Sequence, residues 1–364
     1  HIGLIRGDQF RKKADRKLPQ WMQEQIDEDF RPFLERGISK QQVDETFDTI
    51  RRNLPEPYYI RYRIIDNTLY RYFPKNELIS LDDNDLEKTL KTLMHYFQLN
   101  AIDFIVGYID GIPFPGTPPK FYHTTDEKLQ APLLVFARLN TTRHTVLIPD
   151  WRSIANWWVK DAKTVFSNLD LKPWDKKKNR AYWRGGLTKD SRLNACRISL
   201  HSPEILDIKL VGDELGTDLK QEGVVGEYTT LDQFMDYKYL PTFDGVVCAY
   251  PAFQWRLLSN SVTLKQESNE TQWFYRAVKP YVHYIPIKND LSDLYDQVRW
   301  AHAHDLECRE IAKKSTDFAL NNLMIEDNYT YLYHVLLKYA SLQNLDRQEL
   351  KREMLVDDRW VNIQ

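Results

Sequence analysis

Apolar positions along this chain recur in two different periods, and segments of the two kinds follow one another. Apolar residues at helical spacing predict helices over 86–99, 150–166, 290–303, 306–320 and 329–342. Short runs rich in β-branched and aromatic residues predict strands over 101–109, 132–139, 145–149, 205–211, 261–265 and 283–287. Because strands alternate with helices in both halves of the chain, we predict an α/β protein with two sheets.

The first part of the chain carries sharper local signals. Residues 8–50 are charged and helical in pattern, and Ser39 before Lys40-Gln41-Gln42 is typical of a capping box. The alternating segment 58–72 is interrupted at Asp66-Asn67, which predicts a hairpin. At the other end, the charged tail from Asp346 is expected to be loosely held.

Length and charge suggest how the chain divides. Its 364 residues favour two domains, because single cores stop growing near about 250–300 residues. The run Lys176-Lys177-Lys178 is typical of a solvated hinge and lies in a predicted linker over 169–179. We therefore predict four parts: an N-terminal helical arm (1–55), a first α/β domain (56–170), a second α/β domain (171–320), and a C-terminal helix and tail that can pack back on the first domain (321–364).

Composition narrows the class of protein. Hydrophobic residues make up 42% of the chain, and a formal net charge of −2 gives no general attraction to nucleic acid or anionic membranes. No apolar run approaches the roughly 20 residues of a membrane span. Three cysteines without Cys-x-x-Cys spacing favour a reducing compartment and argue against a zinc site. We expect a cytoplasmic protein.

The segment 181–200 is a candidate binding site. An aromatic strand over 181–183 runs into Gly185-Gly186, and Thr188 or Ser191 can cap a following helix. A strand, a glycine turn and a helix N-terminus together direct backbone N–H groups and the positive end of a helix dipole at one point. The stretch therefore predicts an anion site.

Two arginines flank that point in the sequence. Arg184 precedes the glycines and Arg192 follows them, and guanidinium groups suit phosphate oxygens. The alternative is an ordinary surface turn with two solvated arginines.

A second candidate follows the predicted strand 101–109. Asp110 stands at the end of this strand and before Gly111-Ile112-Pro113, at the edge where α/β proteins place chemistry. The alternative is a turn aspartate that bonds its own backbone.

Four ordered segments of the chain resemble glycosyltransferase family 90. They are Tyr182-Trp183-Arg184-Gly185-Gly186 with Thr188 and Arg192; Tyr237-Lys238-Tyr239-Leu240 with Phe243-Asp244-Gly245; Leu257-Leu258 with Ser261-Val262; and the segment 279–287 with Asp290-Leu291 and Asp293-Leu294. The likeness runs from about residue 102 to about residue 342. The family contains protein O-glucosyltransferases, fungal capsule xylosyltransferases and bacterial lipopolysaccharide-core glycosyltransferases, and residues 1–100 resemble the bacterial members most.

The resemblance implies a GT-B fold, in which two Rossmann-like domains face a cleft, and metal-independent, inverting transfer from a UDP-sugar. It places the catalytic base on Asp110. It places the donor contacts on Arg138, Arg184, Gly185, Gly186, Thr188, Arg192, Gly245, Ala249, Tyr250 and Arg256. One departure is visible: an arginine that many members carry before the paired leucines is absent here or displaced to Arg256.

We therefore predict an inverting glycosyltransferase that moves glucose, galactose or xylose from a UDP-sugar to a hydroxyl of a glycan, of lipopolysaccharide-core type, or of a protein. We expect no cofactor, no metal and no nucleic-acid partner, and any peripheral association with a membrane would come through a lipid-linked acceptor. The alternative is a sugar-nucleotide-binding or carbohydrate-binding protein that has lost catalysis. A phosphoryl-transfer enzyme is disfavoured because the chain has no Gly-x-x-x-x-Gly-Lys-Ser/Thr loop.

Overall fold

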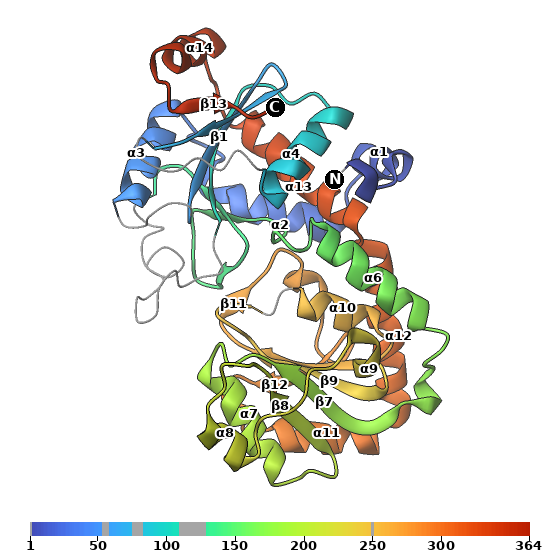
Figure 1. The fold of residues 1–364 in the computed structure, drawn as a ribbon. Helices are drawn as coiled ribbons and strands as arrows, with labels where there is room; N and C mark the ends of the chain where they lie inside the picture. The colour runs from blue at the N-terminus through green and yellow to red at the C-terminus, as the bar shows by residue number, and fades with distance from the viewer. Residues whose placement is uncertain (1, 53–57, 75–82, 109–128, 249–250) are drawn as a thin grey trace. The chain divides into compact units, whose positions relative to one another are not determined.

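The computed structural model describes residues 2–52, 58–74, 83–108, 129–248 and 251–364, and the chain forms two compact units (Figure 1). Unit 1 consists of 1–156, 270–276 and 325–364, and unit 2 of 157–269 and 277–324. Each unit has its own sheet and its own helices, so the predicted α/β class with two units is confirmed.

The chain crosses into unit 2 before the predicted linker 169–179 and returns to unit 1 close to the predicted start of the C-terminal part at residue 321. The chain enters unit 2 at residue 157 and returns to unit 1 at residue 325, and the short segment 270–276 also belongs to unit 1. Trp158 shows why the first crossing comes early: its indole is buried and donates to the backbone oxygen of Leu323, 2.7 Å away within unit 2. The sequence shows that Trp157 and Trp158 lie in a helix, but it does not show which of the two units that helix belongs to.

Unit 1 contains a mixed six-stranded sheet in the order β13-β2-β1-β3-β4-β6. Strands β3, β4 and β6 are parallel, and the remaining pairings are antiparallel. The predicted hairpin is confirmed: Asp66 and Asn67 have φ values of 47° and 58°, as a two-residue hairpin turn with positive φ at both positions requires. The strands are β1 (Ile60–Ile65), β2 (Thr68–Tyr72), β3 (Ile102–Gly107), β4 (Leu133–Val135), β6 (Thr145–Leu147) and β13 (Trp360–Asn362); β5 (Arg138–Leu139) pairs separately with β11 (Glu270–Thr271).

Helix α13 (Ile325–Ser341) is central to unit 1, and most of its residues are buried. It packs against α1 (Gly7–Asp15), α2 (Gln20–Phe30) and α4 (Asp85–Tyr96), as Figure 1 shows. The predicted N-terminal helices are therefore present, and they contribute to the core, because Phe10 and Phe30 are fully buried against tyrosines of α13. Helix α3 (Lys40–Arg51) begins with the capping box predicted at Ser39.

The C-terminal tail is ordered, and the expectation that it is loosely held was wrong. It forms α14 (Arg347–Val356) and β13, and β13 adds an antiparallel strand to the hairpin beside β2. Trp360 is buried there against Tyr72, with ring centroids 5.3 Å apart. The many charged residues of this segment suggested a solvated tail, but the buried side chain of Trp360 holds it against the sheet.

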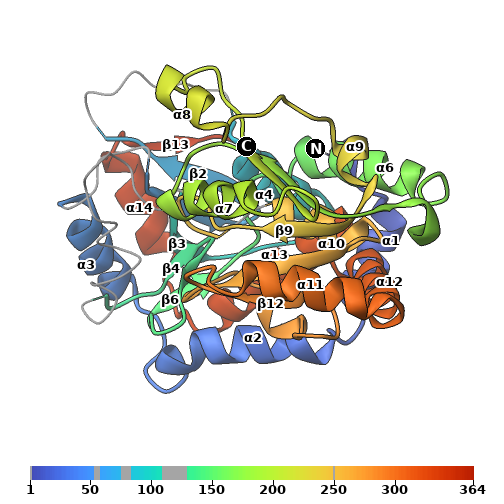
Figure 2. The same ribbon diagram turned by 90° about the horizontal axis from the view of Figure 1, so that it is seen from below.

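Unit 2 contains five parallel strands in the order β12-β10-β9-β7-β8, with helices packed against them (Figure 2). The strands are β7 (Lys178–Gly185), β8 (Leu206–Leu210), β9 (Tyr237–Thr242), β10 (Val262–Glu267) and β12 (Ile285–Lys288). The helices are α6 (Asn156–Asn168), α7 (Asp190–Leu200), α8 (Thr217–Glu222), α9 (Leu231–Phe234), α10 (Ala252–Leu258), α11 (Leu294–Ala303) and α12 (Asp305–Asn322).

The lysine run before β7 is not a solvated hinge, which corrects the sequence-based expectation. Lys177 is buried, and its Nζ donates to the backbone oxygens of Met235 at 2.6 Å and Ser259 at 3.4 Å. Burial lowers the pKa of Lys177 to about 7. Its neighbours Lys176 and Lys178 are exposed, and three consecutive lysines give no sign that the middle one points inward.

Candidate functional site

The strand order of unit 2 reverses between β7 and β9. Strand β8 lies on one side of β7, whereas β9, β10 and β12 follow on the other. In open parallel sheets, ligands bind beyond the carboxyl ends of the two strands that flank such a reversal. Here β7 ends at Gly185 and continues into Gly186, and Asp244-Gly245 follow β9, so two of the predicted motifs meet at the candidate site.

The last residue of β7 has to be glycine. A Cβ on Gly185 would lie 2.3 Å from the indole of Trp183, which is buried in the core of unit 2. The loop that follows leads into α7, whose N-cap residue is Lys189 and whose first turn receives no cap from that side chain. The predicted cap at Thr188 or Ser191 was therefore wrong; Thr188 is exposed and its N–H donates to the oxygen of Gly186.

Arg192 joins the two loops of the site. Its Nη1 donates to the oxygen of Gly186 at 3.0 Å, and its Nε and Nη2 donate to the oxygens of Asp244 at 3.0 Å and Phe243 at 3.1 Å. A Cβ on Gly245 would stand 3.0 Å from Arg192 Nη2 and 3.1 Å from the hydroxyl of Thr188. The structure thus brings together four of the predicted donor residues, Gly186, Thr188, Arg192 and Gly245.

Arg256 contributes a second cation, from α10, and its side chain is buried. Its side chain stacks on Trp255, with the guanidinium carbon 4.4 Å from the ring centre, and its Nη1 donates to the oxygen of Ala252. Within the described ranges no carboxylate pairs with it, and its Nε is buried without a hydrogen-bond partner. Burial and the charge of Arg192 lower the pKa of Arg256 to about 9, and burial lowers the pKa of Arg192 to about 10.

Asp244 is a candidate that the sequence analysis did not single out. It is buried, burial raises its pKa, and its Oδ2 has no hydrogen-bond partner among the described residues. Its backbone N–H donates to Gln266 Oε1 at 3.0 Å, which fixes the loop to β10. The sequence pattern that could have identified Asp244 is the one seen at Asp110, namely an aspartate that follows a strand and precedes glycine.

Arg184 has a carboxylate partner, unlike Arg256. Its Nη2 lies 2.9 Å from Asp207 Oδ1, and its Nη1 donates to the backbone oxygens of Asp207 and Trp183. The guanidinium also stacks over Tyr182, 4.3 Å from the ring centre. Arg184 therefore lies toward β8 and Arg192 toward β9, and Asp207 balances the charge of Arg184.

Arg138 belongs to unit 1. Its Nη2 pairs with Asp29 at 2.5 Å, and its Nη1 donates to the oxygen of Thr145 at 2.7 Å. These contacts hold β5 to α2 and β6, so Arg138 has a structural function within that unit, and its predicted function in donor binding stays a prediction. Asp110, Ala249 and Tyr250 lie outside the described residues, and their predicted functions also stay predictions.

Two features are absent from the described residues. Within these ranges, no group of three or more His, Cys, Asp or Glu side chains is arranged to hold a metal ion. None of the helices in the same ranges has the length and apolar character that crossing a membrane requires.

Comparison with known proteins identifies the chain's relatives. The sequence profile of Glycosyl transferase family 90 matches residues 15–361. Protein O-glucosyltransferase 1 from rat is 26% identical over 337 residues, which cover 86% of this chain and 78% of the relative. Human protein O-glucosyltransferase 3 is 36% identical over 171 residues, which cover 47% of this chain and about a third (34%) of the relative. The longer match therefore includes most of both units.

Proposed function

The chain belongs to glycosyltransferase family 90, and from this premise we propose that unit 2 binds the diphosphate of a UDP-sugar at the β7–β9 reversal. The sugar is transferred with inversion at the anomeric carbon. The transfer uses arginine side chains and a helix N-terminus, rather than a metal ion, to balance the charge of the leaving UDP.

The observation that carries this proposal is the pair of cations Arg192, which is half-buried, and Arg256, which is buried. Removing a charge from water is costly, which is why burial depresses both pKa values, and the charge of Arg192 lowers the pKa of Arg256 further. A diphosphate would bring the missing negative charge to the carboxyl ends of β7 and β9. It would also lie near the N-terminus of α7, where helix amides favour anions. Arg256 is the natural substitute for the arginine that other members carry a few residues earlier.

The chemical step follows from these charges. The bond between the anomeric carbon and the UDP oxygen breaks as the acceptor oxygen attacks from the opposite face, so negative charge grows on the diphosphate. Fixed cations stabilise this charge more in the transition state than in the bound substrate. The acceptor hydroxyl needs a base to take its proton, and we assign that function to Asp110.

We propose glucose as the donor sugar and a protein hydroxyl as the acceptor. The support is the set of relatives named protein O-glucosyltransferases. Galactose, xylose and a glycan acceptor of the lipopolysaccharide-core type are the alternatives that the experiment must separate.

The test combines UDP release with donor and acceptor panels. Purified protein is incubated with UDP-glucose, UDP-galactose or UDP-xylose, with and without a peptide or core-oligosaccharide acceptor, and released UDP is measured. We expect acceptor-dependent release that is fastest with UDP-glucose and a peptide. UDP binding without acceptor-dependent release from any donor would instead support the non-catalytic alternative.

A further inference from the structure

A chain of hydrogen bonds joins the carboxyl ends of four strands in unit 2. It begins at the loop after β7, passes through the loop after β9 and the end of β10, and finishes at the loop after β12. Its central residue is Gln266, on β10, which is 2% exposed. Gln266 is not among the predicted site residues, so its function has to be explained separately.

The side-chain amide of Gln266 has a different partner on each side. Its Oε1 accepts from the backbone N–H of Asp244 at 3.0 Å, and its Nε2 donates to the backbone oxygen of Asn289 at 2.9 Å and to Asn289 Oδ1 at 3.2 Å. Reversing the amide would place an NH2 group against an N–H donor and an oxygen against two oxygens, so these partners fix its orientation. Gln266 therefore joins the loop after β9 to the loop after β12.

The backbone of Asp244 is held from two directions. Gln266 accepts from its N–H, and Arg192 Nε donates to its oxygen at 3.0 Å. Arg192 Nη1 donates in turn to the oxygen of Gly186, in the loop after β7. Since hydrogen bonds are directional, the position of the Arg192 guanidinium depends on where Gln266 holds Asp244.

The loop after β12 anchors the far end of this chain of hydrogen bonds. Leu291 has a φ of 63°, in the left-handed region that a residue with a Cβ seldom adopts, and its side chain is buried in the core of unit 2. Its N–H donates to the oxygen of Lys288 at 2.9 Å, which closes the turn. Because the burial of Leu291 maintains this costly backbone conformation, the loop holds Asn289 against Gln266 in one arrangement.

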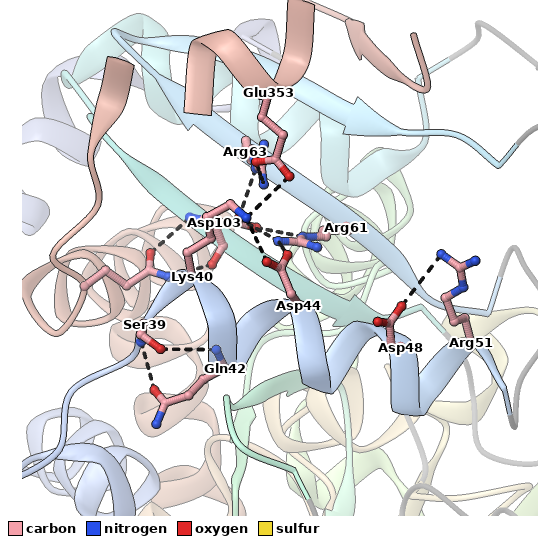
Figure 3. Close-up of polar contacts among 11 residues, drawn as sticks. Ser39, Lys40, Gln42, Asp44, Asp48, Arg51, Arg61, Arg63, Asp103 and Glu353 are labelled. Carbon is pink, nitrogen blue, oxygen red and sulfur yellow. Dashed lines mark hydrogen bonds and ion pairs between the residues drawn. The ribbon is translucent and has the colours of Figure 1, made fainter. Parts of the chain in front are cut away.

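Buried polar contacts alone do not indicate a binding site. Unit 1 contains another group of them, in which Arg61 and Arg63 pair with Asp103 (Figure 3). Those residues lie within β1 and β3 and join two strands of a sheet. The chain through Gln266 differs because it connects the loops beyond the strands. It also ends at Arg192, beside the reversal of strand order where ligands of such sheets bind.

We propose that Gln266 is a positioning residue for the donor site. It acts through Asp244 on Arg192, without touching the ligand, and thereby raises the affinity of unit 2 for a diphosphate. A guanidinium that is already held in place loses less conformational freedom on binding phosphate than one that must first be ordered. The inference rests on the proposed binding of UDP at the β7–β9 reversal.

Titration calorimetry with UDP on the full chain tests this function. Gln266→Met keeps the length of the side chain and removes both polar groups, so UDP affinity should fall about fivefold, the scale of one lost hydrogen bond. In an Arg192→Met background the same substitution should weaken UDP binding no further, because its effect passes through Arg192. The matched control is Thr263→Val, at a buried position of the same strand whose hydroxyl has no hydrogen-bond partner in the described structure; it should leave UDP affinity unchanged.

Gln266→Glu provides a conservative variant. At about pH 5 its protonated carboxyl group can accept from the N–H of Asp244 and donate to Asn289, as the amide does, so it should retain more UDP affinity than Gln266→Met. At about pH 8 the ionised group faces two oxygens of Asn289, so UDP affinity relative to wild type should be lower than in the acidic buffer. A loss of stability alone would not produce this pattern.

The proposal fails if Gln266→Met lowers the melting temperature but leaves UDP affinity unchanged, or if it weakens UDP binding equally with and without Arg192. It also fails if Gln266→Glu has the same UDP affinity relative to wild type at both pH values, a comparison that decides the question where Gln266→Met does not fold. Wild-type protein that does not bind UDP would overturn the proposed function itself, which is a different result.

Discussion

Arg192 and Gly245 lie against each other where the loops after β7 and β9 meet. A Cβ on Gly245 would stand only 3.0 Å from Arg192 Nη2, which itself donates to the oxygen of Phe243. The guanidinium that holds the two loops together therefore leaves no spare room at residue 245. This contact makes the geometry of the candidate site sensitive to a single methyl group.

Gly245→Ala should weaken UDP binding about tenfold, because Arg192 and Thr188 must both shift. The melting temperature should change little, since the shift is a few tenths of an ångström. The matched control is Gly216→Ala, where an added Cβ meets nothing within 4 Å. Titration calorimetry with UDP measures the effect, and equal affinity in the two variants would contradict the site.

Arg256→Met separates a ligand-binding function from a structural one. Removing a buried cation without a carboxylate partner in the described structure should leave the free energy of unfolding unchanged or raise it. UDP affinity should fall by roughly 1.5–3 kcal/mol, the scale of a charged hydrogen bond. Arg299→Met, at an exposed position of α11, is the control. A large loss of stability with unchanged UDP affinity would show that Arg256 is a packing residue.

Asp110→Asn tests the proposed base. The variant keeps shape and hydrogen bonding but cannot accept a proton, so transfer should fall about 10²–10⁴-fold while UDP affinity stays normal. Turnover and UDP binding are measured on the same preparation. Near-normal turnover would leave Asp110 as a turn residue.

Chelation tests the expected metal independence. Acceptor-dependent UDP release should continue in excess EDTA, because Arg192 and Arg256 supply the positive charge. The assay compares chelated protein with protein supplied with Mn²⁺ or Mg²⁺. Activity that returns only with a divalent cation would replace the arginine-based proposal with a metal-based one.

Lys177 gives unfolding a specific pH dependence. Burial and the charge of Lys172 lower its pKa to about 7 in the folded state, against 10.5 in the unfolded chain. Between these values the unfolded state binds more protons, so this lysine makes stability rise with pH, by at most about 1.4 kcal/mol per pH unit. Lys177→Met should remove this rise between pH 7 and about 9.5.

Denaturant titrations across that pH range measure the effect against Lys176→Met, the exposed neighbour. Parallel pH profiles for wild type and Lys177→Met would mean that Lys177 stays charged in the folded protein.

The sequence alone determined the features that depend on neighbouring residues. The capping box at Ser39, the hairpin turn at Asp66-Asn67 and the strand, glycine turn and helix around Gly185 each follow from local backbone preferences. The order of four motifs also identified the family. Such signals are legible because every residue they need lies within a short segment.

Only the tertiary structure decided which partner each charged side chain has. Arg184 pairs with Asp207 because β8 lies beside β7, and Arg192 reaches Asp244 because β9 lies on the other side. Lys177 is the middle residue of a run of three lysines. Its side chain points inward and donates to the backbone carbonyl groups of Met235 and Ser259, far along the chain. The order of the strands in the sheet brings these side chains to their partners. The sequence does not show whether a charged side chain will be surrounded by water or by residues of a distant strand. That is why two arginines that look alike in the sequence, Arg184 and Arg256, have different electrostatic surroundings.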